Sequence, residues 1–192
     1  MRQRILTATR AVWRAEGLEG LSMRKVARRV GVTATALYRH YDGKGALVAE
    51  LVDEARAVFE RHLEGAARGA TPRARLLRAA DAYLAFALGH RRLYEVLLLT
   101  PSEQGMLRLL DSAERWRRDP PRTFRMLVDR VEECQRAGVL RAGDPTETAF
   151  TIWGLAHGLV SLFHAGRFGR DRRWFRGLFR ASIRRLLEGL ER

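Results

Sequence analysis

An all-α fold in two parts is the structure that this 192-residue sequence predicts. Apolar residues recur at helical spacing along nearly the whole chain, and no segment alternates between apolar and polar residues for long enough to be a convincing strand. Charge also sets the N-terminal part apart, because residues 1–45 carry ten basic side chains against three acidic ones. We therefore expect a three-helix N-terminal domain over residues 1–46 and a larger helical domain over residues 47–192.

The first three predicted helices are short and closely spaced. The first has an apolar face and is expected to end at Gly17. Ser22 has the side chain of an N-cap for the second helix, Gly31 ends that helix, and Thr33 caps the third. Two short helices joined by a glycine-containing turn of this length form a helix-turn-helix unit. The apolar face of the first helix consists of Ile5, Ala8, Thr9, Val12 and Trp13.

The third helix is predicted to have one inward and one outward face. Leu37 and Tyr41 are four residues apart and are expected to face inward, with Thr35 and Arg39 opposite them. A helix with small residues near its start and Tyr, Arg and His near its end can enter a major groove, so that its N-terminal residues approach base edges. The net charge of +7 over residues 1–45 fits this interpretation, because a polyanion is the partner that such charge attracts.

The rest of the chain continues as helices separated by short loops. Asp42-Gly43 breaks the chain before a long helix that runs from about Lys44 into the sixties, and residues 65–72 form the next loop. Further helices are expected roughly over residues 73–88, 91–99, 103–116, 121–137, 146–165 and 171–190, with a loop at residues 138–145.

The last two predicted helices carry more apolar surface than one subunit can cover. Residues 148–166 contain no Asp, Glu, Lys or Arg, and we favour a helix buried by protein over a membrane span for this run. A second copy of the chain is the simplest cover, and Gly154 and Gly158 would permit close helix approach. An arginine stripe on the final helix is interpreted as a solvated outer face, with attraction of DNA or an acidic partner as the alternative. The stripe consists of Arg172, Arg176, Arg180 and Arg184.

Composition excludes several classes of protein. Cys134 is the single cysteine, which rules out a disulfide framework or a multi-cysteine zinc site and favours a reducing, cytoplasmic compartment. Arginines interrupt the apolar stretches at the N-terminus, so no secretory signal is expected. The sequence has no phosphate-binding loop, dinucleotide turn, zinc-protease motif or nucleophile constellation, and Glu132-Glu133 would disfavour a thiolate on Cys134. We predict a protein that is not an enzyme and uses no cofactor or metal.

Over its first 50 residues the sequence resembles the tetracycline-repressor (TetR) family of transcriptional regulators. An ordered set carries the resemblance: Ser22, Arg24, Ala27, Gly31-Val32, Leu37-Tyr38, His40, Lys44 and Leu47. Residues 76–190 are similar to a TetR C-terminal subgroup with a Trp…His-Gly signature, here Trp153, His157 and Gly158. The resemblance implies a homodimer joined through its last two helices, a palindromic or pseudo-palindromic operator in double-stranded DNA, and a small-molecule effector.

The resemblance also implies roles for single side chains. Tyr38 and Lys44 match positions that hold backbone phosphates, and His40 and Thr33 match positions often used in the same way. The alternatives are a packed Tyr38 and a surface His40 without a role. Alanine offers a thymine methyl contact but no hydrogen bond, so we expect Arg24, and with it Arg39, to carry an unusual share of base readout. The positions implied for base contacts are Arg24, Ala34, Thr35 and Ala36.

Aromatic and sulfur-containing side chains of the C-terminal part are candidates for a ligand pocket. Ordinary core packing is the alternative, because such residues at helical spacing usually fill cores. His157 and His164 share a face that could hold a metal ion or an acidic ligand, but the helix has no Asp, Glu or Cys beside them, and we interpret them as packed or interface residues. The candidates are Tyr83, Phe86, Met106, Phe124, Met126, Trp153 and His157.

These features together predict a TetR-type repressor that a small, hydrophobic ligand releases from its operator. The alternative is a DNA-binding regulator without a small-molecule inducer, controlled by a protein partner or acting as an activator. The sequence specifies neither the operator nor the effector nor the regulated genes.

Overall fold

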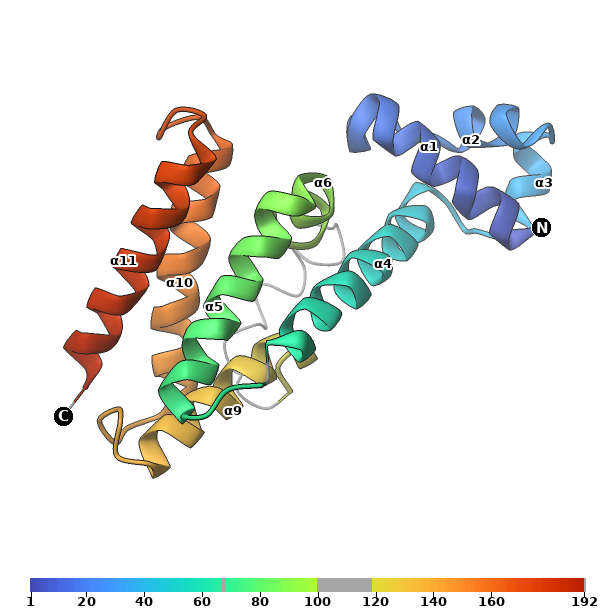
Figure 1. Cartoon of the computed structure of the whole chain (residues 1–192). Helices are drawn as coiled ribbons and strands as arrows, with labels where there is room; N and C mark the ends of the chain where they lie inside the picture. The colour runs from blue at the N-terminus through green and yellow to red at the C-terminus, as the bar shows by residue number, and fades with distance from the viewer. Residues whose placement is uncertain (67, 100–118, 192) are drawn as a thin grey trace. The chain divides into compact units, whose positions relative to one another are not determined.

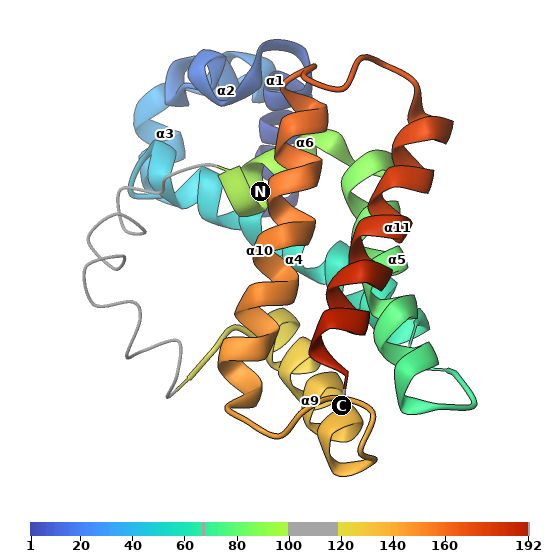
Figure 2. The same ribbon diagram turned by 90° about the vertical axis from the view of Figure 1, so that its left-hand side faces the viewer.

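The computed structural model describes residues 1–66, 68–99 and 119–191, which are mostly helical (Figure 1, Figure 2). The only extended pairing within these ranges is an isolated bridge between Leu140 and Glu191. The prediction of an all-α fold is confirmed; the predicted helix at 103–116, with the ligand candidate Met106, lies outside the described residues. The elements are α1 (Arg2–Gly20), α2 (Met23–Val30), α3 (Ala34–Tyr38), α4 (Lys44–Gly65), α5 (Pro72–Gly89), α6 (Arg91–Tyr94), the π-helical turn η1 (Glu95–Leu99), α9 (Arg122–Arg136), α10 (Pro145–His164) and α11 (Arg172–Leu190).

Contacts divide the described chain into two compact units. The first unit comprises Met1–Ala57 and, among the described residues, His90–Leu99. The second comprises Val58–Gly89 and residues 119–191. The first unit therefore contains the whole predicted N-terminal domain and adds the first part of α4 together with α6 and η1.

Local capping explains where α2 and α3 begin and where α2 ends. The hydroxyl of Ser22 accepts a hydrogen bond from the backbone N–H three residues on (3.3 Å), and the hydroxyl of Thr33 does the same (3.2 Å). Gly31 takes a left-handed conformation with φ 79°, and its N–H and that of Val32 bond back to carbonyls in the last turn of α2. All three predicted caps are confirmed.

Helix α1 differs from the prediction at its C-terminal end. Gly17 leaves the helical region, with φ 73° and ψ −174°, but a further turn follows up to Gly20. The predicted stop at Gly17 is therefore a kink, which glycine adopts because it has no Cβ to clash at positive φ. The predicted apolar face of α1 is buried as a whole: Ile5, Ala8, Thr9, Val12 and Trp13.

The core of the first unit includes a segment that the sequence assigned to the C-terminal part. Leu37 and Tyr41 are buried in it as predicted, with exposed fractions of 0% and 3%. Val96 of η1 belongs to the same core, and Arg92 of α6 donates a hydrogen bond to the carbonyl of Trp13 (2.7 Å). The predicted helix at 91–99 is thus an α-helical turn followed by a π-helical turn, and both pack on the N-terminal helices.

In the second unit α5, α9, α10 and α11 pack against one another, and α10 and α11 run side by side (Figure 2). Asp144 and Asp171 cap the last two helices by accepting hydrogen bonds from backbone N–H groups of their first turns. Helix α10 buries one face, whereas Gly154 and Leu162 remain exposed. Within the described ranges, no helix combines the length and the hydropathy that crossing a membrane requires.

Two arginines of the stripe on α11 bind α5 while they stay exposed, so the predicted solvated face also makes contacts within the fold. Arg180 forms an ion pair with Asp81 at 2.7 Å. Arg172 donates a hydrogen bond to the carbonyl of Leu88 in the last turn of α5, where carbonyl groups have no partner within the helix. The other two stripe arginines are exposed. Half of the stripe therefore joins two helices of the fold.

Candidate nucleic-acid interface

Residues 33–44 expose polar side chains on a buried support. The side chains of Leu37 and Tyr41 fill the core, which leaves the opposite side of α3 in solvent. Tyr38 is 53% exposed, so the alternative of a packed Tyr38 is wrong. An exposed tyrosine hydroxyl is able to donate a hydrogen bond to a phosphate oxygen. The other exposed candidates of this segment are Thr33, Thr35, Arg39, His40 and Lys44.

The side chains proposed to read bases lie on the first turn of α2 and along α3. Arg24 is exposed directly after the Ser22 cap, which fixes the start of its helix. Ala34 and Ala36 are half-buried and present only methyl groups. Thr35 is therefore the polar side chain of α3 proper that is free to approach a base edge, since Arg39 follows the helix end.

The basic residues of this unit differ in whether an acidic side chain neutralises them. Arg24, Arg39 and Lys44 have no acidic partner within 4.0 Å among the described residues, so their charge stays available to a polyanion. Three others on α1 and α2 each pair with a glutamate: Arg2, Arg10 and Lys25.

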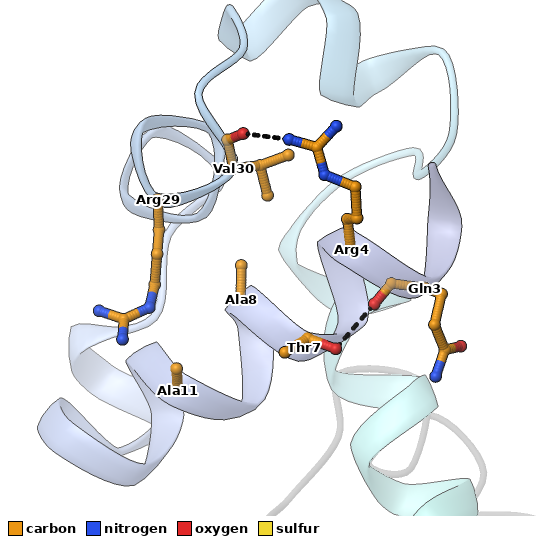
Figure 3. A pocket seen from close by; sticks show the side chains of 7 residues that line it. All are labelled: Gln3, Arg4, Thr7, Ala8, Ala11, Arg29 and Val30. Atoms are coloured by element: carbon orange, nitrogen blue, oxygen red, sulfur yellow. Dashed lines mark hydrogen bonds between the residues drawn. The ribbon is translucent and has the colours of Figure 1, made fainter.

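A hollow of about 350 Å³ opens between α1 and α2 (Figure 3). Residues of α1 from Gln3 to Ala11 line one side, and Arg29 and Val30 of α2 line the other. Arg4 reaches across it to donate a hydrogen bond to the carbonyl of Val30 (3.0 Å). None of the predicted site residues lines this hollow, and no acidic side chain does. Its one hydroxyl, that of Thr7, donates a hydrogen bond to the carbonyl of Gln3 (2.9 Å).

Six of the ligand candidates lie in the second unit; four of them form one cluster, and Met126 on α9 is half-buried. The hydroxyl of Tyr83 on α5 lies 3.1 Å from Nδ1 of His157 on α10. The ring of Trp153 lies 5.4 Å from that of His157 and 6.0 Å from that of Phe124 on α9. Phe86 is linked to this cluster through Phe59. The ring of Phe86 stacks on that of Phe59 at 4.8 Å, and the ring of Phe59 contacts that of Tyr83 edge-on.

Two aromatic residues of this cluster were not among the candidates. Phe59 comes from α4, and Phe150 from α10 has its ring 4.5 Å from that of Phe124. Phe150 precedes Trp153 and His157 by three and seven residues, a spacing that places all three on one helix face. That spacing could have revealed Phe150, whereas Phe59 lies on the ordinary core stripe of α4 and gave no signal.

Burial shifts the pKa values of two groups of the second unit in the direction that favours their neutral forms. Burial lowers the pKa of His157, because the imidazolium form loses hydration. His164 contacts the carbonyl of Ala87 through Nε2 (3.2 Å), in a place separate from His157. Burial, and after it the charge of Glu133, raises the pKa of the Cys134 thiol, so the predicted lack of a thiolate is confirmed with burial as the larger cause. In the described part of the chain, no group of three or more His, Cys, Asp or Glu could hold a metal ion.

A capped helix-turn-helix with an exposed, uncompensated basic segment, attached to a separate helical unit, defines the class of helix-turn-helix transcriptional regulators. Residues 5–51 match the family model of bacterial regulatory proteins of the tetR family. Residues 76–188 match the model of the tetracyclin repressor-like C-terminal domain. The chain belongs to the TetR family, whose members bind operator DNA and typically dimerise.

Known proteins are similar to this chain in part or throughout. The HTH-type transcriptional repressor DrrR1 from Streptomyces coeruleorubidus is 42% identical over 57 residues, which is 30% of this chain and 21% of the repressor. The chain thus matches about a fifth of that relative's length. A protein of unknown function from Rhodococcus sp. RHA1 is 26% identical at a TM-score of 0.77, covering 100% of this chain and 95% of that one. The TetR family transcriptional regulator PfmR from Thermus thermophilus is 21% identical at a TM-score of 0.66, covering 98% and 100%, and shows the fold alone.

Proposed function

We propose that this protein is a cytoplasmic repressor that a small, mostly apolar ligand releases from a palindromic operator. The observation that supports operator binding most directly is the run of residues 33–44, exposed on the buried supports Leu37 and Tyr41. Residues 1–46 bind DNA in this proposal, and residues 47–192 bind the ligand and a second copy of the chain.

Two sets of side chains have different roles at the duplex. Tyr38 and Lys44, helped by Thr33 and His40, hold backbone phosphates and set the orientation of the unit. Arg24 and Arg39 reach base edges, and a bidentate contact to guanine gives about 1–3 kcal/mol of discrimination. The remaining base contacts come from Ala34, Thr35 and Ala36.

A homodimer through α10 and α11 is supported by the apolar side chains that these helices leave uncovered. Leu162 on α10 is 45% exposed and Trp174 on α11 is 51% exposed. On the same two helices, a Cβ built on Gly154, Gly158 or Gly177 meets no other heavy atom of the described chain within 4 Å. Glycines with open space beside them allow a helix of a second copy to approach closely. Twofold symmetry of such a dimer in turn favours a palindromic operator.

The aromatic cluster around Tyr83 and His157 supports a ligand site in the second unit. It offers apolar ring surface from four helices and two hydrogen-bonding groups, which is the composition of many small-molecule sites. Its ligand would be mostly apolar and would exchange hydrogen bonds with the Tyr83 hydroxyl or the His157 imidazole.

Release from DNA requires that ligand and operator favour different arrangements of the dimer. Helix α4 is the element that could carry this coupling, because it begins at Lys44 beside the DNA candidates and contributes Phe59 to the aromatic cluster. The two bindings must then weaken each other by the same free energy.

Selection of bound sequences from a random duplex pool tests this function. We expect a palindrome to emerge, and titrations of that duplex by fluorescence anisotropy to show tighter binding than to bulk DNA at physiological ionic strength. Recovery of unrelated sequences with no preference over bulk DNA would remove the proposal.

Ligand gating is tested separately from DNA binding. A library of hydrophobic compounds is screened for an increase in melting temperature, which a ligand bound only to the folded state produces. Each compound found is then added to the protein–operator complex, where weakened binding is expected. A compound that saturates the protein and leaves operator affinity unchanged favours the alternative, a regulator without a small-molecule inducer.

A further inference from the structure

Two residues from separate parts of the first unit donate hydrogen bonds to one carboxylate oxygen of a third residue, Glu50. The hydroxyl of Tyr41 donates a hydrogen bond to Oε1 of Glu50 (3.2 Å), and Nη2 of Arg2 donates to the same oxygen (2.9 Å). The guanidinium carbon of Arg2 also lies 5.2 Å from the centre of the Tyr41 ring. We call this arrangement the Glu50 clamp. It joins the start of α1, the segment after α3 and the second turn of α4.

The clamp lies at the centre of the segment that carries the DNA candidates. Tyr41 follows Tyr38 by three residues and precedes Lys44 by three, and its ring is only 3% exposed. Its backbone N–H bonds to the carbonyl of Leu37 (3.1 Å). A buried ring that is held at its hydroxyl as well as at its backbone leaves the residues on either side little freedom to shift.

The cation of the clamp is exposed but paired. Hydrogen bonds to Tyr41 and then to Glu50 raise the pKa of the Arg2 guanidinium, whose side chain stays 68% exposed. Glu50 itself is an anion in a unit that binds a polyanion, and as a bare charge it would repel the duplex. Its contact with Tyr41, which lies between Tyr38 and Lys44 in the sequence, therefore calls for a role other than electrostatic attraction.

We propose that Glu50, acting with Arg2 and Tyr41, is a positioning residue for DNA binding, which sets the placement of Tyr38 and Lys44 without touching the duplex. The inference rests on the proposed function of the segment 33–44. Because Glu50 is part of α4, the clamp also makes the placement of these contacts depend on the position of that helix.

The two roles open to Glu50 predict opposite changes in DNA affinity when Glu50 is replaced by glutamine. If Glu50 acted only through its charge, Glu50→Gln would remove a repulsion and tighten binding to any duplex. If Glu50 holds Tyr41 and Arg2 in place, Glu50→Gln weakens binding although the protein becomes more positive. Asp53→Asn is the matched control, because Asp53 lies on the same helix, is exposed and pairs only with Arg56 one turn on.

Affinity for the selected operator is measured by anisotropy at several salt concentrations, far below the melting temperature. We expect Glu50→Gln and Tyr41→Phe each to weaken binding roughly three- to tenfold, the effect of one ordinary intramolecular hydrogen bond. The double variant should bind no more weakly than either single one, because both changes remove the same clamp. Asp53→Asn should bind as well as the wild type or slightly better.

The variant Arg2→Gln distinguishes a positioning role of Arg2 from a direct contact of Arg2 with a DNA phosphate. We expect weaker binding with an unchanged salt dependence, whereas loss of a phosphate contact lowers the slope of log K against log salt by about 0.9. Binding by Glu50→Gln as tight as that of the wild type overturns the inference, as does a lower melting temperature with unchanged affinity. A wild-type protein that prefers no duplex overturns the proposed function itself.

Discussion

The hydroxyl of Tyr83 lies 3.1 Å from Nδ1 of His157, and this contact joins α5 to α10 inside the aromatic cluster of the second unit. Both residues are otherwise surrounded by aromatic rings, with Phe59 against Tyr83 and Trp153 against His157. A hydrogen bond in such surroundings is stronger than one in water, and a charge there is disfavoured. The pair therefore combines a specific polar contact with an apolar wall.

Stability should fall in acid because of His157. Burial holds the pKa of the folded-state imidazole below its ordinary value of about 6.5, so the unfolded chain binds the proton more readily. The contribution of His157 to the free energy of unfolding is present above that ordinary pKa and is lost progressively as pH falls below it. Melting temperatures of the wild type and of His157→Gln, measured between neutral pH and pH of about 5, should show a smaller loss for the variant. Parallel curves would contradict the assignment.

Arg24→Ala and Lys44→Ala should affect DNA binding in different ways. Loss of Arg24 removes a base contact, so preference at one base pair of each half-site should relax, with a penalty of about 1–3 kcal/mol for the preferred base. Loss of Lys44 removes a phosphate contact, so all duplexes should bind more weakly and the salt slope should fall by about 0.9 per site. Titrations of both protein variants with operator variants at two salt concentrations distinguish loss of a base contact from loss of a phosphate contact. Unchanged specificity in Arg24→Ala would defeat its assignment to base readout.

Leu162→Glu should convert the dimer into monomers. The substitution places a charge on the uncovered face of α10, where a partner helix would have to bury it. Operator affinity should fall as well, because two half-sites are no longer held by one linked protein. Light scattering after size-exclusion chromatography gives the mass, with Ala137→Glu as a control that adds the same charge at an exposed site after α9. A Leu162→Glu protein that stays dimeric argues for another interface.

Gly31→Ala should destabilise the protein although no neighbour would clash with the new methyl group. A Cβ at this position meets nothing within 4 Å, but φ is +79°, a conformation that costs an L-residue about 1–2 kcal/mol. Thermal or urea unfolding measures the loss. Gly45→Ala is the control, since Gly45 lies in α4 with open space and no positive φ, and alanine there should be neutral or slightly stabilising. Equal stability of the two variants would show that the turn after α2 tolerates a side chain.

Much of the N-terminal part, residues 1–46, could be predicted because its caps and apolar spacings act over only a few residues. Ser22, Thr33 and Gly31 act through hydrogen bonds that close within a few residues, and the burial of Leu37 and Tyr41 follows from their spacing of four. In the C-terminal part, the positions of the helices could be predicted by the same means, but the contacts between helices could not. The arginine stripe is exposed, as its spacing predicted, but Arg180 and Arg172 also bind α5, a contact that spacing along one helix does not show.

The sequence by itself determined the capped helix ends, such as those at Ser22, Gly31 and Thr33, and the inward faces of α1 and α3, since both depend on interactions over three or four residues. Only the tertiary structure decided which distant side chains meet, such as Arg2 with Glu50, Tyr83 with His157, and Val96 with the N-terminal core. These contacts join residues tens of positions apart, and they arise from the angles and depths at which whole helices pack. The periodicity of apolar residues along the chain does not contain the angles and depths at which helices pack.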